Sequence, residues 1–159
     1  MKIALTGHTK GLGQEIYNSF VREHEVKGFS RSNGYDIKNP RDRNKIMNDS
    51  DESDILINLV HNYYHQTDLL LERFKSWENY NKLIINISSS VVDNKDWGID
   101  RLDHIEYKNQ KIALETMSDL LLKRKSLVKI INYKISEINF QKDISNLNTI
   151  INEFKISKK

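Results

Sequence analysis

The segment Thr6–Gly13 reads TGHTKGLG and directly follows the apolar run IAL at positions 3–5. Beyond it, Leu12, Ile16 and Phe20 recur at the spacing of one helix face. This order predicts a strand, a glycine-rich turn and a helix. Such a turn brings backbone N–H groups and a helix N-terminus to one point, which suits a phosphate or a pyrophosphate.

Three of the six glycines of the chain lie in this turn. Gly7 would permit the sharp exit from the strand, and Gly11 and Gly13 would let the backbone approach a ligand and the helix pack on the sheet. The spacing Thr-Gly-x-x-x-Gly-x-Gly differs from the general Gly-x-Gly-x-x-Gly fingerprint of dinucleotide sites. On this motif alone, a glycine-rich turn without a ligand stays open.

The composition indicates one domain, residues 1–159, with 38% hydrophobic and 30% charged residues. The chain has no apolar run of about 18 residues, and its N-terminus enters a strand at once instead of resembling a signal peptide. It contains no cysteine, which excludes disulfides and thiolate metal sites and fits a reducing compartment. We therefore expect a cytoplasmic protein with no membrane partner.

The net charge of +3 is spread along the chain, with one dense basic cluster at Lys123–Lys125. We interpret this cluster as a solvated helix end, where cations suit the helix dipole, in preference to a nucleic-acid patch. His61 and His65 are four residues apart but lack the Glu and the third ligand of a zinc helix. We therefore expect no nucleic-acid partner and no metal.

The rest of the chain alternates between short apolar runs and segments with helical periodicity. This alternation predicts an α/β fold, a three-layer Rossmann-type parallel sheet with helices on both faces. Asn58 lies inside a buried run, so its amide should tie that strand to a neighbour. The expected strands are 3–5, 25–31, a truncated 35–37, 55–60, 82–87 and 126–131, and the expected helices are 12–21, 40–47, 67–77, 104–123 and 144–154. The apolar face of helix 104–123 is expected to consist of Ala113, Met117, Leu120 and Leu121.

The end of the second strand faces the adenosine ribose in a dinucleotide fold, where an acid favours NAD and a nearby Arg accommodates the 2′-phosphate of NADP. Here the strand ends in Ser30-Arg31-Ser32, and the next acid is Asp36, at the adenine edge. Lys10 in the glycine turn is a second cation that could reach the same phosphate. This set favours NADP(H) over NAD(H), with exposed surface cations as the alternative.

A hydride-transfer site needs an acid or base at the substrate oxygen, and Tyr107 is the one tyrosine of seven with Lys at i+4, Lys111. A neighbouring ammonium favours the phenolate and lowers the pKa of the phenol. The lysine could also hold the nicotinamide ribose. Ser89, or its neighbour Ser88 or Ser90, follows a strand and could hydrogen-bond a substrate carbonyl.

Four motifs occur in the order of one family: the turn Thr6–Gly13, Asn58–His61, Asn86–Ser89 and Tyr107-x-x-x-Lys111. Over residues 2–135 the chain resembles the short-chain dehydrogenase/reductases. The resemblance implies a nicotinamide cofactor, a carbonyl or alcohol substrate, and a homodimer or homotetramer formed through segments 62–79 and 104–123. Tyr107 would be the general acid/base, Lys111 its partner and ribose ligand, and Ser89 the substrate-orienting hydroxyl.

The cofactor residues that the turn, the second strand and the resemblance together imply are Thr6, Gly7, Thr9, Lys10, Gly11, Leu12, Gly13, Ser30, Arg31, Asp36, Asn58, Val60, His61, Tyr107 and Lys111. Asn62 is a candidate for the family's helix-borne catalytic Asn. The chain departs from the family at His61, which stands where the family has Gly, and in the long interval of 18 positions between Ser89 and Tyr107. It also has no Pro-Gly after Ile131 and ends where the family builds its substrate loop and final strand. Two functions therefore stay open: an NADP(H)-dependent oxidoreductase, or a non-catalytic NADP(H)-binding sensor or scaffold that has lost the substrate region.

Overall fold

A computed structural model describes residues 1–135 and 139–158. Five strands form one sheet in the order β2-β1-β3-β4-β5, and every neighbouring pair is parallel. The order confirms the predicted parallel sheet. The strands are β1 Lys2–Thr6, β2 Glu25–Phe29, β3 Ile55–Asn58, β4 Leu83–Ser89 and β5 Lys129–Ile135.

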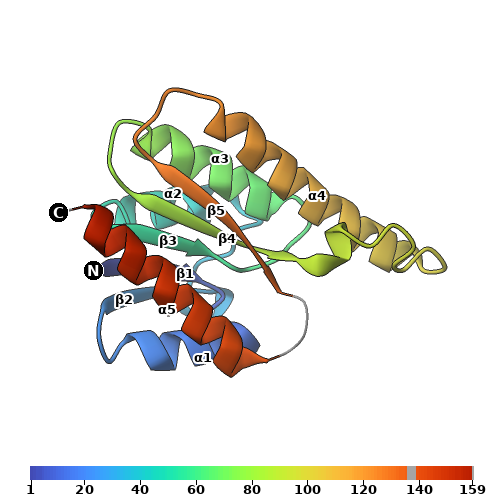
Figure 1. Cartoon of the computed structure of the whole chain (residues 1–159), viewed down its shortest axis with the longest axis horizontal. Helices are drawn as coiled ribbons and strands as arrows, with labels where there is room; N and C mark the ends of the chain where they lie inside the picture. Colours follow the sequence, from blue (N-terminus) through green and yellow to red (C-terminus); the bar gives the residue numbers. More distant parts are fainter. Residues whose placement is uncertain (136–138, 159) are drawn as a thin grey trace.

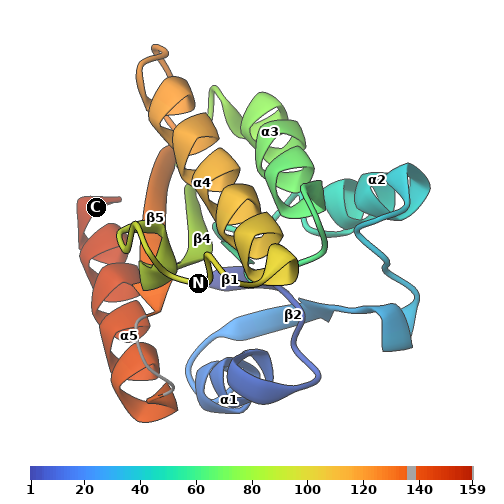
Figure 2. The ribbon, with the colours of Figure 1, turned by 90° about the vertical axis from the view of Figure 1, so that its right-hand side faces the viewer.

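Helices cover both faces of the sheet, which confirms the three-layer Rossmann-type architecture. Helices α1 and α5 lie on one face, and α2, α3 and α4 lie on the other (Figures 1 and 2). None of the helices in residues 1–135 and 139–158 is long and apolar enough to cross a lipid bilayer. The helices are α1 Gly11–Phe20, α2 Pro40–Asp49, α3 His65–Trp77, α4 Leu102–Leu122 and α5 Phe140–Ser157.

Strand β3 shows why the central apolar runs are continuous. Ile55 and Ile57 pack toward α1 and α5, whereas Leu56 between them packs toward α2, α3 and α4. All three side chains are fully buried. Strands covered on both faces need apolar residues at consecutive positions, so period-2 alternation is absent from this segment.

The predicted third strand at 35–37 is wrong. After β2 the chain makes a 3₁₀ turn at Arg31–Asn33, and Ile37 packs its side chain into the core on the α2 side. The carbonyl of Ile37 accepts a hydrogen bond from Arg43 at 2.7 Å, so a side chain takes the place of a neighbouring strand. The sheet consequently ends at β2.

The apolar face predicted for α4 is partly wrong. Leu121 is buried, but Leu120 is 53% exposed. The face that packs on the sheet carries Gln110, Lys111 and Ser118 among its buried residues. These polar groups find partners on neighbouring elements, described below, and a search for apolar periodicity cannot locate them.

Candidate functional site

The strand order reverses between β1 and β3. The strand that follows β1 in the chain, β2, lies on one side of this point, and the strand that follows β3, β4, lies on the other side. Ligands of open α/β sheets bind at such a point, outside the carboxyl ends of the strands. A cavity of about 730 Å³ lies there. Its lining consists of Gly7, Thr9, Lys10, Phe29, Ser30, Arg31, Ser32, Tyr35, Asp36, Ile37, Val60, His61 and Asn62.

The glycine turn has the shape that a pyrophosphate requires. Gly7 has a φ of 75°, and its N–H donates to the carbonyl of Phe29 at 2.8 Å. A Cβ on Gly13 would lie 2.0 Å from the carbonyl oxygen of Gly7, so only glycine lets α1 pack on the turn. Gly11 borders open space, and the first turn of α1 contains no acid. The unpaired N–H groups of the helix start can therefore receive an anion.

The end of β2 contributes the other wall of this cavity. Ser30 and Ser32 share a hydrogen bond between their hydroxyls at 2.8 Å, and both line the cavity together with Arg31. Lys10 reaches the same cavity from the glycine turn, and Asp36 faces them. Within residues 1–135 and 139–158, Lys10 and Arg31 form no ion pair. The structure thus brings these predicted residues together.

Other predicted cofactor residues lie outside the lining. The hydroxyl of Thr6 is buried and accepts hydrogen bonds from the N–H groups of Leu59 and Val60, at 3.0 and 3.1 Å. Strand β3 stops at Asn58, short of the predicted 60, where these two N–H groups bind Thr6. The predicted cofactor residues that are absent from the lining are Thr6, Gly11, Leu12, Gly13, Asn58, Tyr107 and Lys111.

Asn58 is the first member of a ladder of amides that crosses three strands. Asn58, Asn86 and Asn132 stand in register, and their side chains hydrogen-bond in sequence at 3.0 and 3.2 Å. Ser118 of α4 joins the ladder by accepting from Asn86 and donating to Asn132. The prediction that Asn58 ties its strand to a neighbour is confirmed.

Ser89 and Tyr107 meet at the carboxyl end of β4. Burial raises the pKa of Tyr107 above its usual value, and a hydrogen bond with Ser89 opposes the rise. The 18-residue interval loops outward between them, and Trp97 stacks on His104 with a ring separation of 4.7 Å. Ser89 and Tyr107 are therefore neighbours despite the interval.

Lys111 lies one turn beyond Tyr107 and is 3% exposed. Its Nζ donates to the side-chain oxygen of Gln66 at 2.8 Å and to the carbonyl of Ile87 at 2.9 Å, and it lies 5.6 Å from the centre of the Tyr107 ring. Burial lowers the pKa of Lys111 to about 8, and Glu115 opposes this shift. The prediction that Lys111 lowers the pKa of Tyr107 is wrong for this structure, because burial of the phenol raises its pKa.

Sequence reasoning missed Gln66. Its side chain is 2% exposed and donates to the carbonyls of Asn58 and Ile87, at 2.7 and 3.1 Å, while it accepts from Lys111. Gln66, and not the candidate Asn62, contacts Lys111, whereas Asn62 lines the cavity. A signal existed, because Gln66 precedes the apolar Leu69 and Leu70 by three and four residues and shares their helix face.

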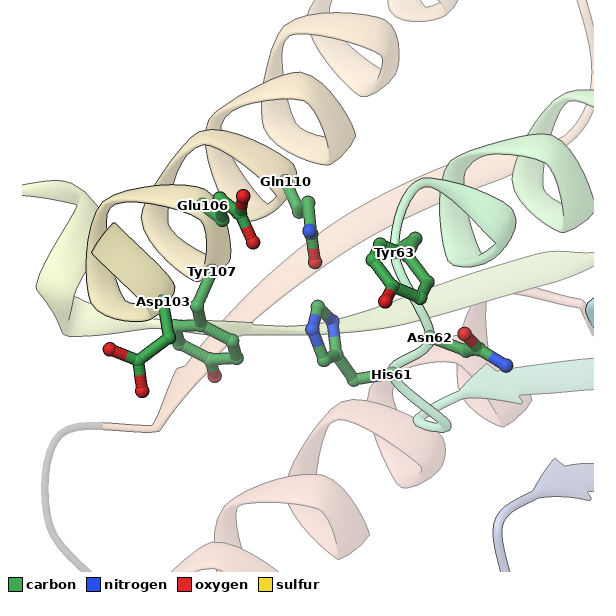
Figure 3. Close-up of a pocket in the computed structure, with 7 residues that line it drawn as sticks. All are labelled: His61, Asn62, Tyr63, Asp103, Glu106, Tyr107 and Gln110. Carbon is green, nitrogen blue, oxygen red and sulfur yellow. The ribbon is translucent and has the colours of Figure 1, made fainter. Parts of the chain in front are cut away.

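A second cavity of about 290 Å³ lies beside Tyr107, between α4 and the segment after β3 (Figure 3). His61 and Asn62 line both cavities. The His61 ring packs edge-on against Tyr107 with a centroid distance of 4.8 Å. Burial, aided by the charge of Lys111, lowers the pKa of His61 to about 4, so its imidazole is neutral at pH 7. The full lining is His61, Asn62, Tyr63, Asp103, Glu106, Tyr107 and Gln110.

Among the residues that the structure describes, no three His, Asp or Glu side chains are grouped so that they could hold a metal ion.

No protein-family model matches the chain, and no curated protein matches it. Solved structures do match its fold. One is a 3-alpha-hydroxysteroid dehydrogenase from Pseudomonas sp. B-0831 complexed with NADH, with a TM-score of 0.67, 15% identity, and coverage of 86% of this chain and 72% of that one. Another is a short chain dehydrogenase from Burkholderia cenocepacia J2315 in complex with NADP, with a TM-score of 0.67, 15% identity, and coverage of 87% and 73%.

A third similar structure is a GDP-L-fucose synthetase from Naegleria fowleri, with a TM-score of 0.69, 12% identity, and coverage of 86% of this chain and 50% of that one. At these identities the likeness concerns the fold. The chain therefore has a fold like that of the short-chain dehydrogenase/reductases.

Proposed function

We propose that the protein is an NADP(H)-dependent oxidoreductase that interconverts a carbonyl and an alcohol. The observation that supports the proposal is that Tyr107, with Ser89 nearby, lines a cavity that shares His61 and Asn62 with the cavity of the glycine turn. His61 and Asn62 line both this cavity and the one beside Tyr107. The comparison structures that contain NADH or NADP support the same assignment.

The residues around the cavity suit a nicotinamide dinucleotide, which when bound would supply or accept a hydride, and we propose NADP(H). The turn from Gly7 to Gly11 and the start of α1 would hold the pyrophosphate through backbone N–H groups. Arg31 and Lys10 would pair with the 2′-phosphate, because they are exposed cations on the wall formed by the end of β2 and the turn. Lys111 would reach the nicotinamide ribose after exchanging part of its present contacts.

Tyr107 suits the role of a proton donor. Its raised pKa keeps the phenol protonated at neutral pH, so its hydroxyl can deliver a proton to the oxygen of a carbonyl that accepts a hydride. Ser89 would hold that oxygen by a second hydrogen bond. Both groups are partly buried, which would limit the access of water to the proton transfer.

The test is turnover of NADPH with a panel of aldehydes and ketones by the Tyr107→Phe variant. We expect loss of turnover by at least about 100-fold, since general acid catalysis contributes about 10²–10⁴-fold, with unchanged NADPH affinity. Tyr80→Phe is the matched control, because Tyr80 is 59% exposed at the end of α3 and lines neither cavity. Equal turnover by Tyr107→Phe and the wild type would refute the assigned role.

A second function is favoured by the contacts of Lys111. Its ammonium donates to Gln66 and to the Ile87 carbonyl, so it is held away from the phenol. A non-catalytic NADP(H)-binding sensor or scaffold needs no reactive tyrosine. This function predicts NADPH binding with no turnover of any carbonyl by wild type or Tyr107→Phe.

We also propose a homodimer or homotetramer formed through α3 and α4, which lie side by side on one face of the sheet (Figure 2). Sedimentation equilibrium should then give a dimer or tetramer mass at micromolar concentration. A monomer mass at every concentration would contradict this proposal.

A further inference from the structure

The cavity beside Tyr107 has a distinctive charge. Two of its seven lining residues are acids, Asp103 and Glu106, and none is a cation at pH 7 because the pKa of His61 is lowered to about 4. Asp103 is paired with Arg101 at 2.5 Å. Among the described residues, Glu106 forms no ion pair. The cavity therefore carries one uncompensated carboxylate.

Gln110 supplies an independent sign of a ligand. Its side chain is 7% exposed, lines the cavity and forms no hydrogen bond with any residue in 1–135 or 139–158. Figure 3 shows its carboxamide pointing toward the space above His61, on the same side as the carboxylate of Glu106. The amide atoms of Gln110 are accessible from the cavity and have no partner among the described residues, so they are free to pair with a polar ligand there.

Aromatic rings form the other walls. Tyr107 and His61 pack edge-on against each other, and the ring of Tyr63 lies across the cavity from Glu106 (Figure 3). The faces of such rings attract cations. Tyr63 also has a φ of 47° and is 62% exposed, so a backbone turn of unusual conformation presents this ring at the cavity.

From the carboxylate of Glu106, the unpartnered carboxamide of Gln110 and the ring of Tyr63 around one cavity, we infer that this cavity binds a primary ammonium group of the substrate. This inference rests on the proposed function, since it takes the cavity beside Tyr107 as the substrate side of the site. Glu106 pairs with the ammonium charge, and the side-chain oxygen of Gln110 accepts a hydrogen bond from one of the ammonium N–H groups. The substrate class is then an amine-bearing aldehyde, ketone or alcohol.

The test compares three probes of similar size, benzylammonium, benzyl alcohol and benzoate, whose binding to the full chain is measured by ligand-observed NMR with and without NADPH. We expect benzylammonium to bind about tenfold tighter than benzyl alcohol, as for one charge-assisted hydrogen bond, and benzoate to bind weakest. Glu106→Gln and Gln110→Leu should remove this preference. Asp119→Asn is the control, because it deletes an exposed charge on the same helix away from both cavities.

Equal affinity for the three probes, or tighter binding of benzoate, would overturn the inference. So would a benzylammonium preference that survives in both Glu106→Gln and Gln110→Leu. The measurement needs no turnover, so it separates the two proposals. A preference for benzylammonium without any NADPH binding refutes the proposed oxidoreductase and supports the ammonium site. NADPH binding without this preference refutes the ammonium site and leaves the proposed oxidoreductase standing.

Discussion

The Nζ of Lys111 donates a hydrogen bond to the side-chain oxygen of Gln66 at 2.8 Å, across the packing contact between α3 and α4. Gln66 in turn donates to the carbonyl of Asn58, whose amide begins the ladder across β3, β4 and β5. The turn of α4 that carries Tyr107 is therefore fixed to the sheet through one lysine. Positioning of this kind limits the freedom of a reacting group.

Replacing Gln66 should weaken the fold as well as release Lys111. Gln66→Leu leaves the buried carbonyl of Asn58 and the Lys111 ammonium each short of a partner, so we expect the free energy of unfolding to fall by about 3 kcal/mol. Urea unfolding measures this change. In a double-mutant cycle with Lys111→Met, the coupling should be about 1–3 kcal/mol. A coupling near zero would show that the two side chains act independently.

Lys111 should titrate far below an ordinary lysine. Burial lowers its pKa to about 8, and Glu115 holds the pKa up. In ¹H–¹³C spectra of lysine-labelled protein, one Cε signal should therefore shift with a midpoint near pH 8. Glu115→Gln removes the opposing charge and should move this midpoint to lower pH, whereas Asp119→Asn should leave it unchanged. A midpoint at the usual value of about 10.4 would contradict the buried placement.

His61 should stay neutral well below pH 6. Its pKa is about 4 because burial disfavours the imidazolium, with a smaller contribution from the charge of Lys111. NMR titration of the imidazole should show this midpoint, and Lys111→Met should raise it because a nearby positive charge is removed. Tyr107→Phe retains the ring contact and should leave the midpoint nearly unchanged. A wild-type midpoint near 6.5 would contradict the lowered pKa of His61.

Arg73 is expected to stabilise the fold at a distance from the site. Its guanidinium is fully buried, stacks on Trp77 and donates to the carbonyls of Ile46 and Met47 near the end of α2. Arg73→Leu removes the donor of the Met47 carbonyl and one of the donors of the Ile46 carbonyl, which keeps Ser50, and we expect a loss of about 3 kcal/mol in urea unfolding. Arg124→Leu breaks the more exposed pair with Glu78 and should cost less than about 1 kcal/mol. Equal losses in the free energy of unfolding for Arg73→Leu and Arg124→Leu would show that the buried contacts of Arg73 stabilise the fold no more than an exposed ion pair.

Periodicity and turn chemistry predicted most of the fold. The continuous run at 55–60 indicated a strand covered on both faces, and the glycine turn indicated the start of α1, since these signals depend on neighbours in sequence. Segment 35–37 has strand-like residues, but its backbone lacks a partner, and the carbonyl of Ile37 binds Arg43 instead. That competition depends on a side chain of the following helix, which the strand propensity of residues 35–37 does not reveal.

The site was predictable where a residue type has a characteristic chemistry. Ser30, Arg31 and Lys10 share one cavity as expected, and Ser89 meets Tyr107. Gln66 was not predictable as a partner of Lys111, because a glutamine near a helix start is more often exposed. The sequence also predicted the wrong direction for the shift in the pKa of Tyr107. This direction depends on burial of the phenol and on the orientation of the Lys111 ammonium group.

The central claim is tested most directly by titrating the purified protein with NADPH and, separately, with NADH, following the nicotinamide fluorescence. The account predicts that NADPH binds at least about tenfold tighter, as one charge-assisted phosphate contact implies. Arg31→Ala should abolish the preference, and Arg22→Ala should preserve it, because Arg22 is exposed and lines neither cavity. Tighter binding of NADH, or binding of neither nucleotide, would contradict the account.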